Sequence, residues 1–420
     1  MVDDPNTNDT GEASLDQAFA RCSSLALVRP ELLARKAYVP ALPNKQLIRL
    51  HANENPWSIE DVETGDEALQ RAVEKLSQSG VKNKSALTAS NASNYTAAAA
   101  ESRELNRYPD PRSAELLAAM SSYYEIDQSC ILPVRGSDDG IDLLTRVFCA
   151  AGKDSITISS PAFGMYAAFA EVQGASVVDI PMQLVEDKFS YNLEQIAANT
   201  AQSKLVYICS PNNPSGNSVP RDQIIDLCKQ LDGRAMVIAD EAYIEFSSQQ
   251  SVSALVAEQD NLVVLRTLSK AFGAAGLRLG AVLAHPELIR VLQSISTPYA
   301  LPTPVIELAL QGLRPEALSA LQSRCQFLLE HRAQLSEALA NHSQVLKVYD
   351  SDANFLLVKF ADAELVANAL SDNGILVRNF SKAPGCENCL RITIGLEEEN
   401  RKLLSVLDRI PGSSTSEKLS

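Results

Sequence analysis

The chain has 420 residues, a formal net charge of −15 and 45% hydrophobic residues. Its mean hydropathy of −0.07 is ordinary for a soluble globular protein, and its length is sufficient for one large core and a second, smaller domain. The acidic balance argues against a nucleic-acid-binding protein, and the apolar runs are too short to cross a bilayer, so neither a nucleic acid nor a membrane is expected as a partner.

The first 17 residues contain neither a basic stretch nor an apolar stretch of the kind found in signal peptides. Eight cysteines are scattered along the chain without a disulfide-scaffold pattern, which favours a reducing compartment and a cytoplasmic location. Cys386 and Cys389 form a C-x-x-C without a second pair, and the four histidines lack metal-ligand spacing. No metal site is expected.

The chain begins with a polar stretch and a proline-rich stretch, which we interpret as an N-terminal extension and arm over residues 1–52. A low-complexity stretch at about 80–102 is typical of a surface insertion. The predicted large domain covers residues 53–302 and includes this insertion.

From about residue 113 to 290, helix patterns alternate with short, β-branched apolar runs. The expected strands are 131–134, 155–159, 176–180, 205–209, 236–239 and 262–266. Helix patterns separate most of them, among them 140–148, 164–172 and 221–231. Continuous apolar strands in this alternation predict an α/β fold with a mostly parallel sheet covered by helices on both faces.

After about residue 303 the pattern changes. Helix patterns over 305–341 are followed by expected strands at 345–349, 354–359 and 390–394. This order predicts a smaller α+β domain over residues 303–412, followed by a tail at 413–420.

Polar, small or aromatic residues follow five of the expected strands. In chain order the five segments are RGSDDG, SPAFGMY, SPNNPSG, DEAY and TLSKAF. Ligands of open parallel sheets bind beyond the carboxyl ends of the strands, so we expect one site built from several loops. The phosphate-binding motif G-x-x-x-x-G-K-[ST] and the dinucleotide motif G-x-G-x-x-G are both absent from the sequence.

The residue types at these loops match the parts of one flat, phosphorylated ring. A helix beginning near Gly136 offers free backbone N–H groups to a phosphate. The residues that could complete this phosphate site are Ser137, Asp138, Thr267, Ser269 and Arg278. A phosphate alone, however, does not name the ligand.

The remaining residues point to the ring itself. Asp240, at the end of a buried strand, needs a cationic partner such as a protonated pyridine nitrogen. Tyr243 and Asn213 could donate to a phenolate oxygen, Phe163 could stack on the ring, and Lys270 could form a Schiff base with an aldehyde. Phosphate, aldehyde, phenolate and pyridinium on one ring describe pyridoxal 5′-phosphate.

The segments SPNNPSG, ADEAY and TLSKAFGAAGLRLG resemble the fold-type I, class-II aminotransferases. The segments NENPW, LNRYPDP, RGSDDGIDLL, PAFGMY and LRITIG narrow this resemblance to the histidinol-phosphate aminotransferases. The resemblance runs from about residue 28 to 407. It implies a large domain with a mostly parallel seven-stranded sheet, a smaller α+β domain, and the cofactor contacts given above, with Phe163 where relatives often have Tyr or Trp.

The resemblance also assigns residues that the strand ends alone do not. Tyr108 matches a tyrosine that reaches the cofactor phosphate of the neighbouring subunit, which implies a homodimer with shared active sites. Tyr38, Arg378 and Arg391 match residues that bind the substrate anion.

The implied reaction is transamination of L-histidinol phosphate with 2-oxoglutarate, giving imidazole acetol phosphate and glutamate in histidine biosynthesis. The alternatives are transamination of an aromatic amino acid and decarboxylation of threonine phosphate with the same cofactor. A ligand-sensing domain of a transcriptional regulator is disfavoured, because the short acidic N-terminus cannot hold a helix-turn-helix. We expect only structural roles for His51, Asn53 and Glu54.

Overall fold

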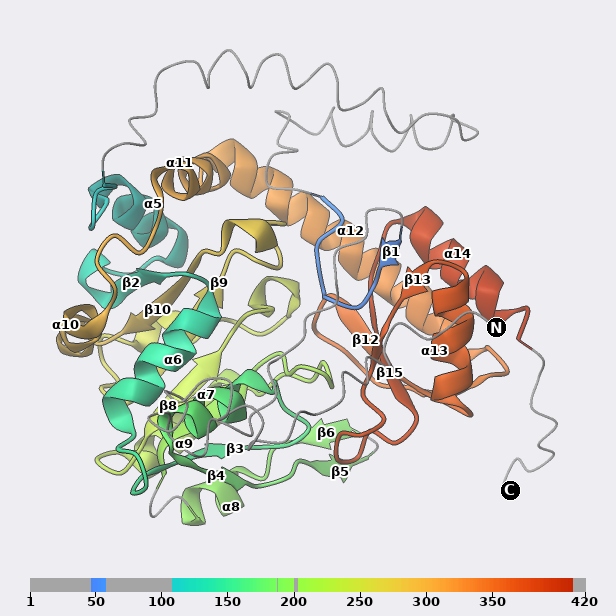
Figure 1. The fold of residues 1–420 in the computed structure, drawn as a ribbon, viewed down its shortest axis with the longest axis horizontal. Coiled ribbons are helices and arrows are strands. Elements are labelled where there is room, and N and C mark those ends of the chain that lie inside the picture. Colours follow the sequence, from blue (N-terminus) through green and yellow to red (C-terminus); the bar gives the residue numbers. More distant parts are fainter. Residues whose placement is uncertain (1–46, 58–107, 187, 200–202, 411–420) are drawn as a thin grey trace, which may run out of the picture. The chain divides into compact units, whose positions relative to one another are not determined.

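The computed structural model describes residues 47–57, 108–186, 188–199 and 203–410 (Figure 1). All of them belong to one compact unit, Gln46–Ser420. Tyr38 and the predicted insertion at about 80–102 lie outside the described residues, and the predicted domain boundaries stay a prediction.

A seven-stranded sheet carries the loops of interest. Its strands are β2 (Ile131–Val134), β3 (Ser155–Ile158), β4 (Ser176–Asp179), β7 (Ser203–Cys209), β8 (Met236–Asp240), β9 (Leu262–Thr267) and β10 (Gly280–Ala284). The order is β2-β10-β9-β8-β7-β3-β4, and only β10 runs antiparallel to its neighbours. The six expected strands and the mostly parallel α/β architecture of fold type I are confirmed.

The strand β10 was not among the individually predicted strands. Its sequence, GAVLA, consists mainly of small residues, and a single β-branched side chain gives little strand signal. Gly280 is required there because a Cβ would lie 2.6 Å from the Arg266 carbonyl oxygen and 2.9 Å from the Ser137 nitrogen.

Successive side chains of a strand point to opposite faces of the sheet, so alternate residues of the central strands belong to two different hydrophobic clusters. On β8, Val237 and Ala239 belong to one cluster, whereas Ile238 belongs to the other. Side chains of α6 (Ser137–Phe148), α7 (Met165–Gln173) and α10 (Pro286–Ile295) join Ile238. Side chains of α5 (Ala114–Tyr124), α8 (Leu193–Ala198) and α9 (Arg221–Leu231) join the first cluster. Helices therefore cover both faces of the sheet, as predicted.

A second, antiparallel sheet follows in the C-terminal part of the chain. Its order is β11 (Val345–Val348), β12 (Phe355–Phe360), β15 (Cys389–Thr393) and β14 (Arg378–Asn379). The helices of this part are α11 (Thr303–Gly312), α12 (Pro315–Ala340), α13 (Ala363–Asp372) and α14 (Glu397–Leu407). The predicted helix pattern over 305–341 is thus two helices, because Pro315 occupies the first turn of α12 and cannot continue α11.

Short elements complete the described chain. The pair β1 (Ile48–Arg49) and β13 (Ile375–Leu376) is parallel, and β5 (Gln183–Val185) with β6 (Lys188–Ser190) forms a hairpin. The 3₁₀ helices are η3 (Gln128–Cys130), η4 (Ile244–Phe246), η5 (Ser253–Leu255) and η6 (Ala275–Leu277). None of the described helices is long and apolar enough to cross a membrane.

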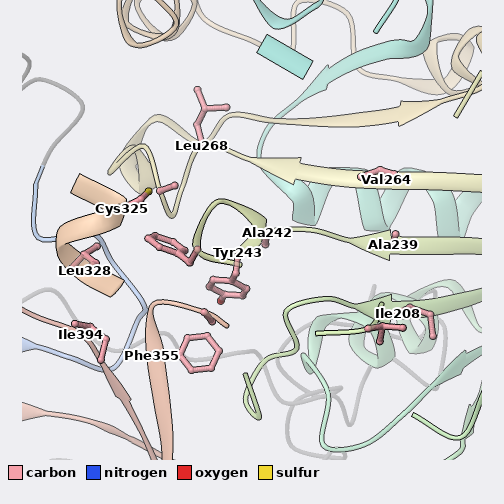
Figure 2. Close-up of a cluster of buried hydrophobic side chains, with 14 of the residues drawn as sticks. Ile208, Ala239, Ala242, Tyr243, Val264, Leu268, Cys325, Leu328, Phe355 and Ile394 are labelled. Carbon is pink, nitrogen blue, oxygen red and sulfur yellow. The ribbon is translucent and has the colours of Figure 1, made fainter. Parts of the chain in front are cut away.

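One core cluster joins the loop after β8 to the second sheet. Figure 2 shows Tyr243 from that loop and Phe355 from the start of β12 pointing toward one another, with Cys325 and Leu328 of α12 nearby. The two rings meet edge to face, with centroids 5.2 Å apart and an angle of 86° between their planes. Tyr243 is therefore held by packing on the second sheet as well as by its own strand.

Candidate functional site

The parallel strands end at one edge of the large sheet, so their following loops share that edge. The register pairs Asp240, the last residue of β8, with Cys209 of β7 and with Leu265 of β9. The five segments predicted to form one site thus leave strands that run in the same direction.

The start of α6 forms the phosphate-binding end of this site. Gly136 precedes the helix, has a φ of +79° and makes no side-chain cap, so backbone N–H groups of the first turn are open to a ligand. A Cβ on Gly136 would lie 2.7 Å from Nη2 of Arg278. That guanidinium also pairs with Asp138 over 3.2 Å. A glycine here leaves room for a cation beside the helix start.

Two hydroxyl groups lie close together just after β9. Thr267 Oγ1 and Ser269 Oγ are 2.9 Å apart, and the Ser269 N–H donates to Thr267 Oγ1 over 3.1 Å. Thr267 therefore shapes the turn that presents Ser269. Both residues are buried, and Gly280 brings β10 against the Ser137 nitrogen at the same place.

Asp240 provides a buried carboxylate, with 3% of its surface exposed. Its Oδ2 accepts a hydrogen bond from Tyr166 Oη over 2.6 Å, and its Oδ1 accepts one from the Ala242 N–H over 3.2 Å. Burial raises the pKa of Asp240 to about 6. A buried carboxylate of this kind has lone pairs left for a cation such as a protonated ring nitrogen. The sequence did not predict Tyr166 in this position.

Lys270 lies in the turn after β9, where its amine donates to the Ala52 carbonyl over 3.2 Å. The amine is 5.7 Å from the centre of the Tyr243 ring. Burial, followed by the positive charge of Arg391, lowers the pKa of Lys270 to about 8. A lysine with such a pKa is partly neutral near physiological pH, and the neutral amine is both a nucleophile and a base.

Asn53 supports Tyr243, although the sequence suggested only a turn role for it. Its Nδ2 donates to Tyr243 Oη over 3.0 Å, and 1% of Asn53 is exposed. Thr393 and Asn354 bind Asn53 through its N–H, its Oδ1 and its carbonyl, at 3.0–3.2 Å. Because the Tyr243 oxygen accepts from Asn53, its own proton stays available for a ligand. Only the position of Asn53 in NENPW, a segment of the resemblance, could have signalled this role.

Arg391 of β15 is a buried arginine that contacts Asn213. Its guanidinium donates to Asn213 Oδ1, and to the His51 carbonyl over 2.6 Å. Because Arg391 occupies Oδ1, the amide nitrogen of Asn213 is the group that can donate to a ligand. The Asn213–Pro214 peptide bond is cis.

Arg378 is placed directly opposite Arg391 in the register of β14 and β15. Arg378 is exposed, whereas 6% of Arg391 is exposed. Burial lowers the pKa of His51, and the charges of Arg49, Arg391 and Arg378 lower it further against the opposing effect of Glu54. Two guanidinium groups on neighbouring strands are suited to bind an anionic ligand.

The two predicted aromatic contacts differ in their surroundings. Phe163 meets the edge of Tyr166, with centroids 5.6 Å apart. Tyr108 is 80% exposed and stacks on Tyr299, with centroids 4.5 Å apart. The structure therefore joins Phe163 to Asp240 through Tyr166, and it presents Tyr108 on the surface.

Comparisons with known proteins agree with these features. Residues 49–407 match the family model described as "Aminotransferase class I and II". The chain is 40% identical over 308 residues to histidinol-phosphate aminotransferase 1 of Haemophilus influenzae, covering 73% of this chain and 87% of that protein. It is 42% identical over 305 residues to histidinol-phosphate aminotransferase of Xanthomonas euvesicatoria, covering 72% and 84%.

Solved structures share the fold. The structure of histidinol-phosphate aminotransferase from Sinorhizobium meliloti in complex with pyridoxal-5′-phosphate superposes with a TM-score of 0.72 at 19% sequence identity. The alignment covers 91% of this chain and 98% of that one. Because the family match spans most of the chain, this protein belongs to the class I and II aminotransferase family.

Proposed function

We propose that this enzyme transfers the amino group of L-histidinol phosphate to 2-oxoglutarate, producing imidazole acetol phosphate and glutamate in histidine biosynthesis. The observation that carries the proposal is the arginine pair Arg378 and Arg391, which lie opposite one another on β14 and β15, with Arg391 close enough to Lys270 for its charge to lower the pKa of the lysine. Histidinol phosphate offers a phosphate and no α-carboxylate, whereas glutamate offers two carboxylates. Arginine side chains bind both kinds of anion. The relatives that are 40–42% identical carry the same enzyme name.

Pyridoxal 5′-phosphate is the cofactor of this enzyme class, and the residues present fit it. Gly136 leaves the space that a Cβ would fill beside Arg278, and Asp240 is a buried carboxylate in need of a cation. The phosphate would be held by Gly136, Ser137, Asp138, Thr267, Ser269 and Arg278. The ring would be held by Asp240 at its nitrogen, Tyr243 and Asn213 at its oxygen, and Phe163 at its face. When bound, the cofactor supplies an electron sink for the substrate's α-carbon.

Lys270 carries out the proton transfer in this scheme. Its pKa of about 8 makes the neutral amine available to take the α-proton of the substrate and to return it. The Ala52 carbonyl, 3.2 Å from the amine, fixes the position of Nζ. The same neutral amine is the group that would hold the cofactor through its aldehyde.

Two groups would control the charge on the ring. Asp240 would hold a proton at the ring nitrogen, which requires the ionised carboxylate. Tyr243 would donate a hydrogen bond to the ring oxygen, while Asn53 donates to Tyr243 over 3.0 Å. Because both groups are buried and fixed by hydrogen bonds, little reorganisation accompanies the reaction.

Arg391 orients the substrate anion. Its guanidinium is fixed by Asn213, by the His51 carbonyl, and by the rings of Phe355 and Phe380, each 5.3 Å from its centre. Arg378 adds a second charge from the exposed side, and Tyr38 is proposed as a third anion contact.

The proposal extends to the assembly and its location. A homodimer would place Tyr108 of one subunit at the cofactor phosphate of the other, and the exposure of the stacked pair Tyr108 and Tyr299 supports such a contact. The cytoplasm is the proposed location, in keeping with the absence of a disulfide-scaffold pattern among the cysteines.

Steady-state kinetics with three amino donors test the substrate assignment. Histidinol phosphate should give the highest kcat/KM with 2-oxoglutarate as acceptor, ahead of phenylalanine, and threonine phosphate should release no carbon dioxide. Lys270→Ala serves as the control for background turnover. A kcat/KM for phenylalanine equal to or above that for histidinol phosphate would overturn the assignment and favour an aromatic aminotransferase.

A further inference from the structure

A buried tyrosine lies behind the carboxylate of Asp240. Tyr166 is in the first turn of α7, and its Oη donates to Asp240 Oδ2 over 2.6 Å although the two residues are 74 positions apart. Both residues are buried. None of the roles assigned above uses this hydrogen bond.

The Tyr166 ring is fixed by aromatic neighbours on two sides. It stacks on Tyr207 of β7, with centroids 4.4 Å apart and planes 16° apart. It also meets Phe163 edge to face at 86°. Because packing fixes the ring, the hydroxyl is placed independently of Asp240, and the carboxylate orients toward it.

The direction of the hydrogen bond is set by protonation. Burial raises the pKa of Tyr166 well above its ordinary value, so the hydroxyl keeps its proton and acts as the donor. The groups that can titrate or carry charge around Asp240 come from five other parts of the chain and from the loop that follows Asp240 itself. They are Asp138, Tyr166, Tyr191, Tyr207, Cys209, Tyr243 and Lys270.

Among these groups, Tyr166 makes the short hydrogen bond to the carboxylate. A donor bound to an ionised carboxylate stabilises the charged form more than the protonated form. The other bond, from the Ala242 N–H, is longer at 3.2 Å. Loss of the Tyr166 hydroxyl would therefore leave Asp240 both harder to ionise and freer to rotate.

We propose that Tyr166 is a positioning residue that keeps the Asp240 carboxylate ionised and aimed at the cofactor's ring nitrogen without touching the cofactor itself. The role at the ring nitrogen rests on the proposed function. The effect on Asp240 does not, because it follows from the hydrogen bond in the protein alone.

Tyr166→Phe tests the role, and Tyr207→Phe is a matched control. Each variant removes one buried hydroxyl from the same stacked pair, and the hydroxyl that donates to Asp240 is that of Tyr166. Infrared difference spectra of the cofactor-free proteins, with Asp240→Asn used to assign the carboxyl band, would follow protonation of Asp240. We expect the midpoint to rise by about one pH unit in Tyr166→Phe and to stay unchanged in Tyr207→Phe.

Cofactor affinity provides the second readout. The Kd for pyridoxal 5′-phosphate should rise about tenfold in Tyr166→Phe, and by less than twofold when the same change is made in Asp240→Asn. The double variant separates an effect through Asp240 from a general loss of folding. An unchanged midpoint, or an equal rise in Kd in both backgrounds, would overturn the positioning role. Wild-type protein that binds no cofactor would overturn the proposed function instead.

Discussion

Asp240→Asn is expected to change the pH dependence of the stability of the cofactor-free enzyme. Burial raises the pKa of Asp240 from 3.8 to about 6 in the folded chain. A shift of about two units corresponds to about 3 kcal/mol that the ionised carboxylate costs the folded state at neutral pH. Because the folded pKa lies above the unfolded value, protonation of Asp240 favours the folded state. This gain in stability is fully present below pH 3.8 and is lost as the pH rises through about 6.

Urea denaturation of the cofactor-free wild type and variant at pH 5 and pH 7.5 measures the effect. With the folded pKa at about 6, the unfolding free energy of wild type should rise by about 1.4 kcal/mol more than that of Asp240→Asn when the pH is lowered from 7.5 to 5. The asparagine keeps an oxygen for Tyr166 but loses the acceptor that faces the Ala242 N–H. That loss does not depend on pH, so it cancels when the two pH values are compared.

The result that would refute the reasoning is a stability difference between wild type and Asp240→Asn that stays constant over this range. It would mean that Asp240 remains ionised at pH 5 in the folded protein, and that its hydrogen bonds outweigh its burial. The variant should also lose transamination, since asparagine cannot hold a proton at the ring nitrogen.

Three further predictions concern other parts of the site. The rate at which the cofactor-free enzyme captures pyridoxal 5′-phosphate should rise about tenfold per pH unit up to about pH 8 and then level, because only the neutral Lys270 amine attacks the aldehyde. Stopped-flow absorbance measures this rate, and a rate that does not change with pH would contradict the prediction. Asn53→Ala should lower kcat/KM by about fivefold to tenfold, since Tyr243 loses a hydrogen bond of about 1 kcal/mol, and unaltered kinetics would exclude the role. Gly136→Ala should weaken cofactor binding, measured by equilibrium titration, because its Cβ would lie 2.7 Å from Arg278. Gly152→Ala is the control, because Gly152 also has a positive φ, +70°, but its Cβ would have no neighbour within 4 Å. Equal cofactor affinities of the two variants would refute the role of the space beside Arg278.

The sheet and the first contacts of the site could be predicted because their signals are local. Each expected strand was a short apolar run, and each loop after it carried residues suited to a ligand. Lys270 and Asp240 followed from such segments without knowledge of the fold. By contrast, β14 has two residues and no apolar signal, so its pairing with β15 depends on the register that the fold imposes.

The roles of Tyr166 and Asn53 were also beyond prediction from the sequence, but for a different reason. Each acts on a residue far along the chain, 74 positions for Tyr166 to Asp240 and 190 positions for Asn53 to Tyr243. The apolar sequence of α7 explains Tyr166 as a core residue, and a turn explains Asn53 with its φ of +53°. Only the packed structure shows which polar atom each of them reaches.

These two residues support opposite sides of the proposed ring site from different parts of the fold. Asp240 and Tyr243 are three positions apart, yet Asp240 is bound by Tyr166 of α7, on a helix that covers the large sheet. Tyr243 is bound by Asn53, which is tied to Thr393 of β15 in the second sheet. Arg391 lies on that same strand. A change in position of the second sheet on binding of the substrate anion would therefore act on the hydrogen bonds at the ring oxygen, while those at the ring nitrogen would stay fixed by the large sheet.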